Sequence, residues 1–211
     1  MKDLIEPKKS WKIPQTHFIN AINDEWYRKL VEIENLISKY TNLFYIEKNI
    51  KTMHLPITTG SISSPMGLGS DSIPVKIQLG GRDTYLADSM QFALEYGCRF
   101  FENGVWYIMP SFRGESEDKR HLSQFYHSEA EICGKLEDVM QLVEEYLKYL
   151  SKNILKEYEK EIIDIAGTSE HIHKFINLKE IPKVTFEEAI DLDVEALGKQ
   201  LVKYKEKQRS K

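Results

Sequence analysis

The segment 111–132, SFRGESEDKRHLSQFYHSEAEI, places the strongest constraint on what this chain can fold into. It follows the apolar run VWYIMP, which is typical of a buried strand, and it ends in the alternating piece QFYHSEAEI. Two strands joined by a short polar segment predict an antiparallel hairpin, with strands over 106–110 and 124–132. The loop of this hairpin carries three side chains suited to binding an anion, namely Arg113, Arg120 and His121.

The alternation in the second strand decides which of its side chains share a face. One face is expected to carry Phe125, His127, Glu129 and Glu131, and the other Gln124, Tyr126 and Ser128. Carboxylates beside a phenylalanine indicate a hydrated pocket, because burial of unpaired charge is costly. The simpler interpretation of this segment is a solvated loop with mixed charges. The more specific interpretation is a binding site for a triphosphate.

Composition limits the kind of protein to which this hairpin belongs. A chain of 211 residues with 41% hydrophobic residues can bury one good core, so one domain is expected. The formal net charge of -4 argues against a non-specific nucleic-acid-binding protein, which needs a basic surface. No segment has the length of a membrane span or the apolar core of a signal peptide, so we expect a cytoplasmic protein and no membrane partner.

Two amphipathic helices are predicted, one before the hairpin and one after it. The first covers 21–40, with apolar residues at helical spacing: Ile22, Trp26, Leu30, Ile33 and Ile37. The second follows Gly134 and is expected to run to about Tyr158, with a stripe of Leu136, Val139, Met140, Val143, Leu147, Leu150 and Ile154. Both stripes are expected to serve core or dimer packing.

Between the first helix and the hairpin, Gly, Ser and Pro punctuate short β-prone pieces, of which VKIQL is predicted to be a strand. A short helix is then expected over 87–97, ADSMQFALEYG. Its N-cap would be Asp88 or Ser89, and Gly97 would end it.

The cysteines and histidines do not form a recognisable metal motif. Cys98 and Cys133 make no C-x-x-C pair, and both are expected to be reduced and packed. His171 and His173 would share one face of a strand, but two ligands without a third do not predict a metal site. We therefore expect no metal held by the protein alone.

The order of residues in the hairpin resembles motif 2 of the class II aminoacyl-tRNA synthetases, in the aspartate, asparagine and lysine subgroup. The matching positions are Phe112, Arg113, Glu115, Arg120, His121, Phe125, Glu129 and Glu131. Upstream, YLADSMQFALE resembles the S-x-Q-L segment of that family. The resemblance covers most of residues 45–195. It implies an α+β fold with an antiparallel β-sheet flanked by helices, incomplete at its C-terminal end.

The resemblance implies a site for ATP with Mg2+. In amino-acid activation the substrate carboxylate attacks the α-phosphate, so alignment and charge stabilisation carry the catalysis. Arg113 would be the catalytic residue, bridging the α-phosphate and the substrate carboxylate with its planar fork. The remaining ATP-binding side chains would be Arg120 and His121 on the β- and γ-phosphates, Phe125 stacked on adenine, and Glu115 at the adenine or acceptor side.

The resemblance also implies a site for a small amino acid, with tRNA as a possible further partner. The substrate-binding residues would be Ser89, Gln91, Glu129 and Glu131, of which the two glutamates would read the substrate amine or assist magnesium. The amino acid stays open between aspartate and asparagine, because Gln124 replaces the usual Glu, Gly114 is small, and the motif 2 loop is one residue shorter than in the asparagine type.

Other departures from the family concern whole elements. No glycine-rich motif 3 with its arginine follows Ile190, the acidic magnesium ligands before it are missing, and no OB-fold precedes the catalytic part. We expect an N-terminal helical segment over 1–44, a synthetase-like catalytic domain over 45–195 with motif 2 at 111–132, and a basic tail over 196–211.

Two classes of function are compatible with this pattern. The first is a ligase, or part of a split one, that activates the amino acid and passes it to tRNA or to a small amine, with a separate chain carrying motif 3. The second is a non-catalytic paralogue that binds ATP or amino acid as a sensor or partner subunit. A homodimer is expected, because the motif 1 helix of the resembling family lies at a two-fold interface.

Overall fold

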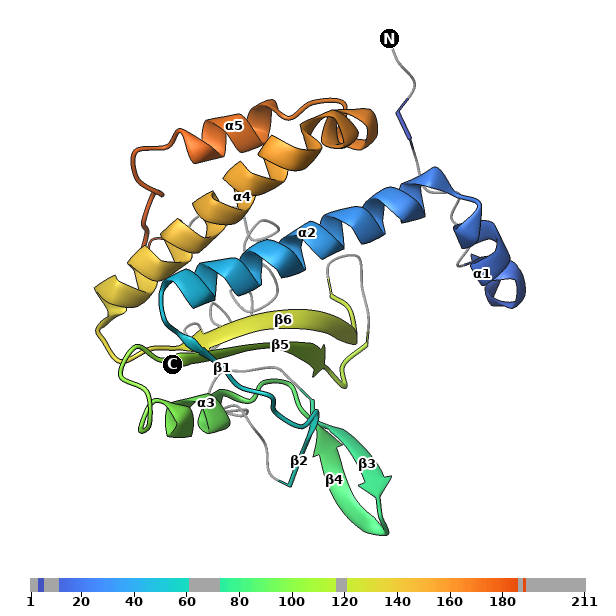
Figure 1. Ribbon diagram of the computed structural model, residues 1–211. Coiled ribbons are helices and arrows are strands. Elements are labelled where there is room, and N and C mark those ends of the chain that lie inside the picture. The colour runs from blue at the N-terminus through green and yellow to red at the C-terminus, as the bar shows by residue number, and fades with distance from the viewer. Residues whose placement is uncertain (1–3, 6–11, 61–72, 117–120, 186–187, 189–211) are drawn as a thin grey trace. The chain divides into compact units, whose positions relative to one another are not determined.

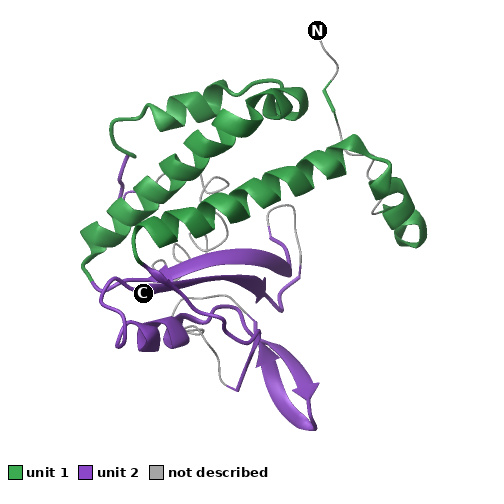
Figure 2. Cartoon of the chain, viewed as in Figure 1, with its two compact units in different colours: residues 1–49, 134–181 green, residues 50–133, 182–211 purple. Residues whose placement is uncertain are grey.

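The structure is a computed structural model, shown in Figure 1, that describes residues 4–5, 12–60, 73–116, 121–185 and 188. The chain divides into two compact units, one from 1–49 and 134–181 and the other from 50–133 and 182–211 (Figure 2). In the described residues the first unit is helical, and the second holds the strands and one short helix. The segment boundaries expected at 44 and 195 stay predictions, and the basic tail over 196–211 lies outside the described residues.

The described part of the first unit consists of α1 (Pro14–Ile22), α2 (Glu25–Glu47), α4 (Leu136–Ala166) and α5 (Glu170–Ile176). The helix predicted over 21–40 therefore has other bounds in the structure. The helical conformation is interrupted between α1 and α2, so the predicted segment is divided between the two helices. Asp24 causes the restart, because its carboxylate accepts a hydrogen bond of 3.0 Å from the N–H of Trp26 and caps α2.

The long helix after Gly134 is confirmed, but it does not end where expected. Tyr158, the predicted end, has non-helical dihedrals of φ -139° and ψ 20° and marks a kink, after which α4 continues to Ala166. Gly167 then ends the helix in the left-handed conformation.

The buried face of α2 differs from the predicted stripe. Its buried residues are Lys29, Leu36, Tyr40, Thr41, Phe44 and Tyr45, whereas Ile22 is 79% exposed and Ile37 is also exposed. Aromatic packing accounts for the difference, since the ring of Phe44 lies 5.2 Å from that of Tyr146 on α4. On α4 the apolar residues Leu136, Val139, Val143 and Leu147 are exposed as well. The core interpretation is therefore wrong for these positions, and dimer packing stays a prediction.

The larger sheet of the second unit has the order β1-β5-β6, with β1 (Lys51–Thr52), β5 (Val105–Phe112) and β6 (Gln124–Glu131). β5 and β6 pair antiparallel along their whole length, which confirms the predicted hairpin. β1 pairs parallel with β5. The α+β class with an antiparallel hairpin at its centre is thus confirmed, with one parallel strand added.

A second sheet has the order β2-β4-β3, with β2 (Thr58–Thr59), β3 (Val75–Leu79) and β4 (Arg82–Leu86). The strand predicted at VKIQL is confirmed as β3. Gly80 and Gly81 connect β3 to β4 with φ of 58° and 75°, values that a two-residue hairpin turn requires and that glycine adopts without strain.

The short helix α3 (Gln91–Gly97) begins later than predicted, and its N-cap is Met90 instead of Asp88 or Ser89. The side chains of Asp88 and Ser89 point to other partners, described below. α3 packs with β5 around a buried cluster of Ala87, Met90, Leu94, Val105, Tyr107 and Met109. Among the described residues, none of the helices combines the length and apolarity that a bilayer-spanning segment requires.

Candidate active site

The register of the β5–β6 hairpin brings two rows of side chains onto one face, called here the site face. Phe125, His127 and Glu129 of β6 lie opposite three residues of β5, respectively Ser111, Met109 and Tyr107. Side chains two apart on a strand share a face, so the predicted grouping of the β6 residues is confirmed. The site face therefore changes from an aromatic end at Phe125 to an acidic end at Glu129.

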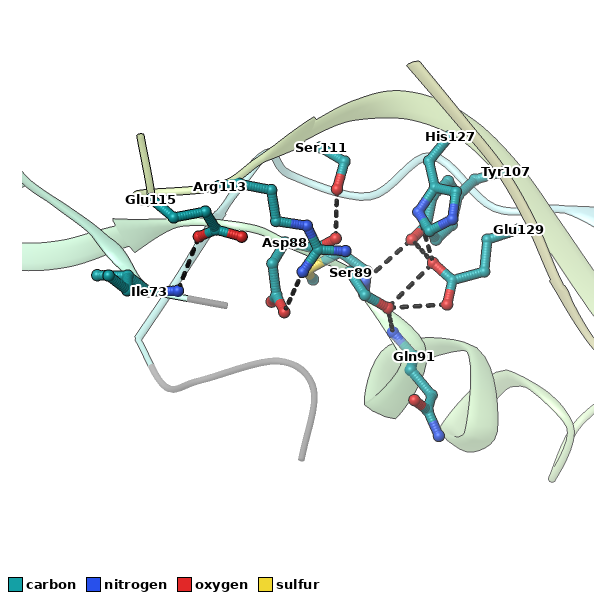
Figure 3. Close-up of polar contacts among 11 residues, drawn as sticks. Ile73, Asp88, Ser89, Gln91, Tyr107, Ser111, Arg113, Glu115, His127 and Glu129 are labelled. Carbon is teal, nitrogen blue, oxygen red and sulfur yellow. Dashed lines mark hydrogen bonds and ion pairs between the residues drawn. The ribbon is translucent and has the colours of Figure 1, made fainter. Parts of the chain in front are cut away.

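Glu129 is the centre of a hydrogen-bond network at the acidic end (Figure 3). The hydroxyl of Ser89 donates to its two carboxylate oxygens at 2.8 and 3.0 Å, and the hydroxyl of Tyr107 donates to Oε2. Each hydroxyl also accepts a backbone N–H, from Gln91 at 3.0 Å and from Met90 at 2.9 Å. Because the hydroxyl oxygens receive these N–H groups, their own protons point toward the carboxylate.

The acidic surroundings change two ionisation equilibria. Burial, together with the hydrogen bond to Glu129, raises the pKa of Tyr107 above the usual phenol range, so its hydroxyl stays a neutral donor. Burial also raises the pKa of Glu131, and the nearby carboxylates of Glu95 and Glu129 raise it further. Glu95 in turn accepts a hydrogen bond of 3.0 Å from the side-chain amide of Gln91.

Arg113 follows the last residue of β5 and lies at the aromatic end. Its Nη1 is 3.2 Å from Oδ2 of Asp88, and its guanidinium lies 5.8 Å from the centre of the Phe125 ring. Asp88 is only 4% exposed, and its backbone carbonyl accepts a hydrogen bond from the hydroxyl of Ser111. A buried carboxylate therefore orients the guanidinium (Figure 3). The side chain of Arg113 is still 24% exposed.

Two further described residues of the predicted ATP site, Glu115 and His121, lie in the segment between β5 and β6. Glu115 accepts a hydrogen bond of 3.0 Å from the backbone N–H of Ile73, on the segment that leads into β3. His121 is exposed just before β6. Arg120 lies outside the described residues, so its role stays a prediction.

The structure thus brings Ser89 and Gln91 together with Glu129 and joins Arg113 to Phe125, but it also reveals residues that sequence reasoning missed. Asp88 was considered only as a helix cap, and Tyr107 only as part of a strand. The two strand sequences leave the register of the hairpin open, so the pair Tyr107 and Glu129 is fixed only by the folded chain. The pairing of Asp88 with Arg113 had no signal in the sequence either.

No group of three or more potential metal ligands occurs among the described residues. His171 and His173 lie in helix α5, not in a strand, and Nε2 of His173 is 2.5 Å from Oε1 of Glu159. Both cysteines are free, but only Cys98 is partly buried, and burial raises the pKa of its thiol to about 11. Cys133 is exposed, which corrects the expectation that it is packed, and its thiol lies 3.7 Å from the backbone carbonyl of Cys98.

This fold, with its hairpin site, matches a known class of protein. The family described as "tRNA synthetases class II (D, K and N)" matches residues 13–209, and the chain belongs to that family.

Two similar proteins of this family are asparagine–tRNA ligases. The enzyme of Desulfitobacterium hafniense is 29% identical over 79% of this chain, and that of Thermococcus kodakarensis is 34% identical over 56% of it. The matches span 40% and 27% of those proteins, so this chain corresponds to less than half of either.

A solved structure agrees in fold. Asparaginyl-tRNA synthetase from Pyrococcus horikoshii, complexed with asparaginyl-adenylate, superposes with a TM-score of 0.69, covers 82% of this chain and is 24% identical. The match spans 38% of that protein. At this identity the likeness shows the fold alone.

Proposed function

We propose that the protein is an ATP-dependent amino-acid-activating ligase of the asparaginyl- or aspartyl-tRNA synthetase type, acting as a partial or split catalytic domain. One observation carries the proposal. On a single face of one hairpin, an oriented guanidinium lies over the Phe125 ring at one end, and Glu129 with two oriented hydroxyls lies at the other. Asparagine is the first candidate substrate, because the similar proteins reported above are asparagine–tRNA ligases.

In the proposed reaction the amino-acid carboxylate attacks the α-phosphate of ATP, and pyrophosphate leaves. Arg113 touches both groups, because its fork can bind an oxygen of each while the bond forms. The ring of Phe125 would stack on adenine. The guanidinium of Arg113 lies 5.8 Å from the centre of this ring. Asp88 holds Arg113 in place from the buried side. No protein nucleophile is needed, so positioning of these groups accounts for the chemistry.

The acidic end suits the substrate ammonium. A carboxylate offers roughly four acceptor positions, and the two hydroxyl donors leave part of Glu129 for a charged donor from the ligand. Glu131 lies two residues further on the same face, Gln91 is the first residue of α3, and Ser89 lies just before that helix. Together these groups would form the amino-acid site.

Mg2+ would enter with ATP. The described residues provide no three-ligand set for a metal, and magnesium in nucleotide sites is commonly held by phosphate oxygens with one or two carboxylates. When bound, the ion neutralises charge on the phosphates.

Pyrophosphate exchange tests the proposal directly. The 211-residue chain is assayed with each amino acid, alone and together with the product of a neighbouring gene that encodes a motif 3 segment. For a split ligase we expect little exchange by the chain alone and asparagine-dependent exchange by the mixture. Full exchange by the chain alone would contradict the partial-domain proposal.

A second candidate is a non-catalytic paralogue that binds ATP or an amino acid as a sensor or partner subunit. The same groups on the site face, a guanidinium over the Phe125 ring and a hydroxyl-bonded Glu129, suffice to bind a ligand without turnover. Calorimetry separates the two candidates. Binding of ATP with Mg2+, but no exchange in any mixture, would support the paralogue.

The assembly and location of the protein are also part of the proposal. We propose a cytoplasmic homodimer, with the exposed apolar residues of α4 as part of its contact, and tRNA as the acceptor or as a further partner. Sedimentation at micromolar concentration tests the dimer, and monomer alone would contradict it.

A further inference from the structure

His127 lies on the site face of β6, two residues from Phe125 and two from Glu129. Two residues of a strand span about 7 Å, so the ring lies between the end proposed for adenine and the end proposed for the amine. Its register partner on β5 is Met109, which is buried and apolar. Packing alone does not account for an imidazole at this position.

One ring nitrogen of His127 faces a carboxylate. Nδ1 is buried without a hydrogen-bond partner among the described residues, and it lies 3.6 Å from Oε2 of Glu129. The side chain as a whole is 34% exposed. The distance exceeds that of a hydrogen bond, but such contacts are often long in ligand-free sites and shorten when substrate binds.

Glu129 is placed to determine which ring nitrogen of His127 carries the proton. Ser89 and Tyr107 hold the carboxylate in position, so it presents Oε2 to the ring. A carboxylate that accepts the Nδ1–H proton selects the tautomer whose lone pair is on Nε2. An imidazole in this tautomer is a proton acceptor, with Glu129 as the group that orients it.

We propose that His127 is the proton acceptor in the second half of the reaction, when the activated acyl group is transferred to a small amine. The inference rests on the proposed function, since it requires an aminoacyl-adenylate in the site. In that intermediate the acyl carbon lies between adenine and the α-amine, which is the interval occupied by His127. Activation itself needs no base, because the attacking carboxylate is already ionised, whereas an attacking amine must lose a proton.

The step balances without a further reactant. The nitrogen lone pair of the amine forms a bond to the acyl carbon, and the bond from that carbon to the phosphate oxygen breaks, with its electron pair leaving on AMP. The proton lost by the nitrogen passes to Nε2 of His127. The products are an amide, AMP and an imidazolium that returns its proton to water.

The test supplies chemically prepared asparaginyl-adenylate to the full chain, which bypasses activation. Ammonia is the acceptor, and mass spectrometry measures the amide formed. We expect His127→Gln to slow amide formation by about 10²-fold or more, the usual contribution of a general base. Tyr126→Gln, an exposed position on the opposite face of the same strand, is the matched control and should react like the wild type.

Hydroxylamine, which is unprotonated at neutral pH, serves as a second acceptor. It depends less on a base, so we expect His127→Gln to lose much less rate with hydroxylamine than with ammonia. Equal losses with both acceptors would overturn the inference, because a structural defect affects both alike.

Calorimetry with the stable sulfamoyl analogue of asparaginyl-adenylate distinguishes the two ways to fail. If the wild type does not bind the analogue, the proposed function fails and this inference with it. If wild type and variant bind it alike, but amide formation from ammonia is equally fast in both or no faster than in buffer, only the role of His127 is overturned. Thermal melting of the variant checks that the fold is kept.

Discussion

The two ends of the site face are organised in different ways. At the Glu129 end, backbone N–H groups at the start of α3 orient two hydroxyls, and both hydroxyls donate to one carboxylate. At the Arg113 end, an ion pair of 3.2 Å and an aromatic ring position one guanidinium. The proposed amino-acid end is therefore held together by a network of hydrogen bonds within the protein. The proposed nucleotide end is held by one ion pair and one cation–π contact.

The largest effect is expected at Gly104, which precedes β5 at the Glu129 end of the hairpin. Gly104 has φ 99°, and a Cβ there would overlap the carbonyl oxygen of Glu131 and lie 2.9 Å from Cα of Ile132. Gly104→Ala should therefore lower the free energy of unfolding by about 3 to 5 kcal/mol. Chemical denaturation measures this loss. Gly60→Ala is the control, since its Cβ would meet nothing within 4 Å, and equal stabilities of the two variants would refute the account.

Arg113→Ala tests the other end, and it should affect both binding and stability. A bidentate, charge-assisted contact to phosphate contributes roughly 2 to 4 kcal/mol when desolvated, so ATP binding should be largely lost. The melting temperature should fall as well, because the buried carboxylate of Asp88 loses its ion pair with Arg113. Arg113→Lys should recover little, because an ammonium does not span two oxygens. Calorimetry with ATP and Mg2+ gives the affinities, with exposed Arg82→Ala as the control. If Arg113→Ala bound ATP as tightly as the parent, the assignment of segment 111–132 to motif 2 would be wrong.

Tyr107→Phe sharpens the contrast by removing one hydroxyl from the acidic end. The change leaves the N–H of Met90 without its acceptor and Glu129 without one donor. We expect a loss of about 1 to 3 kcal/mol in the free energy of unfolding, the usual cost of an unsatisfied buried group. Tyr126→Phe, whose side chain is 75% exposed, should have almost no effect in the same urea titration. If Tyr107→Phe left the free energy of unfolding unchanged, the hydrogen-bond network would contribute little to stability.

Glu131→Gln should have the smallest effect, and it depends on pH. The folded state raises the pKa of Glu131, so it binds this proton more tightly than the unfolded chain. Folding is therefore disfavoured as pH rises through the range of this carboxyl, and the penalty is complete above the folded-state pKa. The glutamine variant should melt about 1 to 2 °C higher than the parent at pH 7 and no higher at pH 4. A higher melting temperature of the variant at pH 4, but not at pH 7, would contradict this prediction.

Local pattern was enough to predict the hairpin and the face that Glu129 shares with Phe125. Strand alternation and antiparallel pairing are short-range rules, and both held for β5 and β6. The helix stripes were less predictable, because aromatic contacts such as that of Phe44 with Tyr146 decide which face is buried. The same limit applied to Asp88. A carboxylate that can cap a helix can also pair with an arginine 25 residues later, and only the folded chain selects the partner.

The unequal thiols make the protein convenient for spectroscopy without further engineering. Cys133 is exposed two residues after Glu131, whereas the Cys98 thiol has its pKa raised to about 11 and holds a hydrogen bond of 3.3 Å to the carbonyl of Glu131. A maleimide reacts with thiolate, so at neutral pH a fluorophore should attach at Cys133. Such a label reports from the end of β6 and gives ligand titrations on the natural sequence.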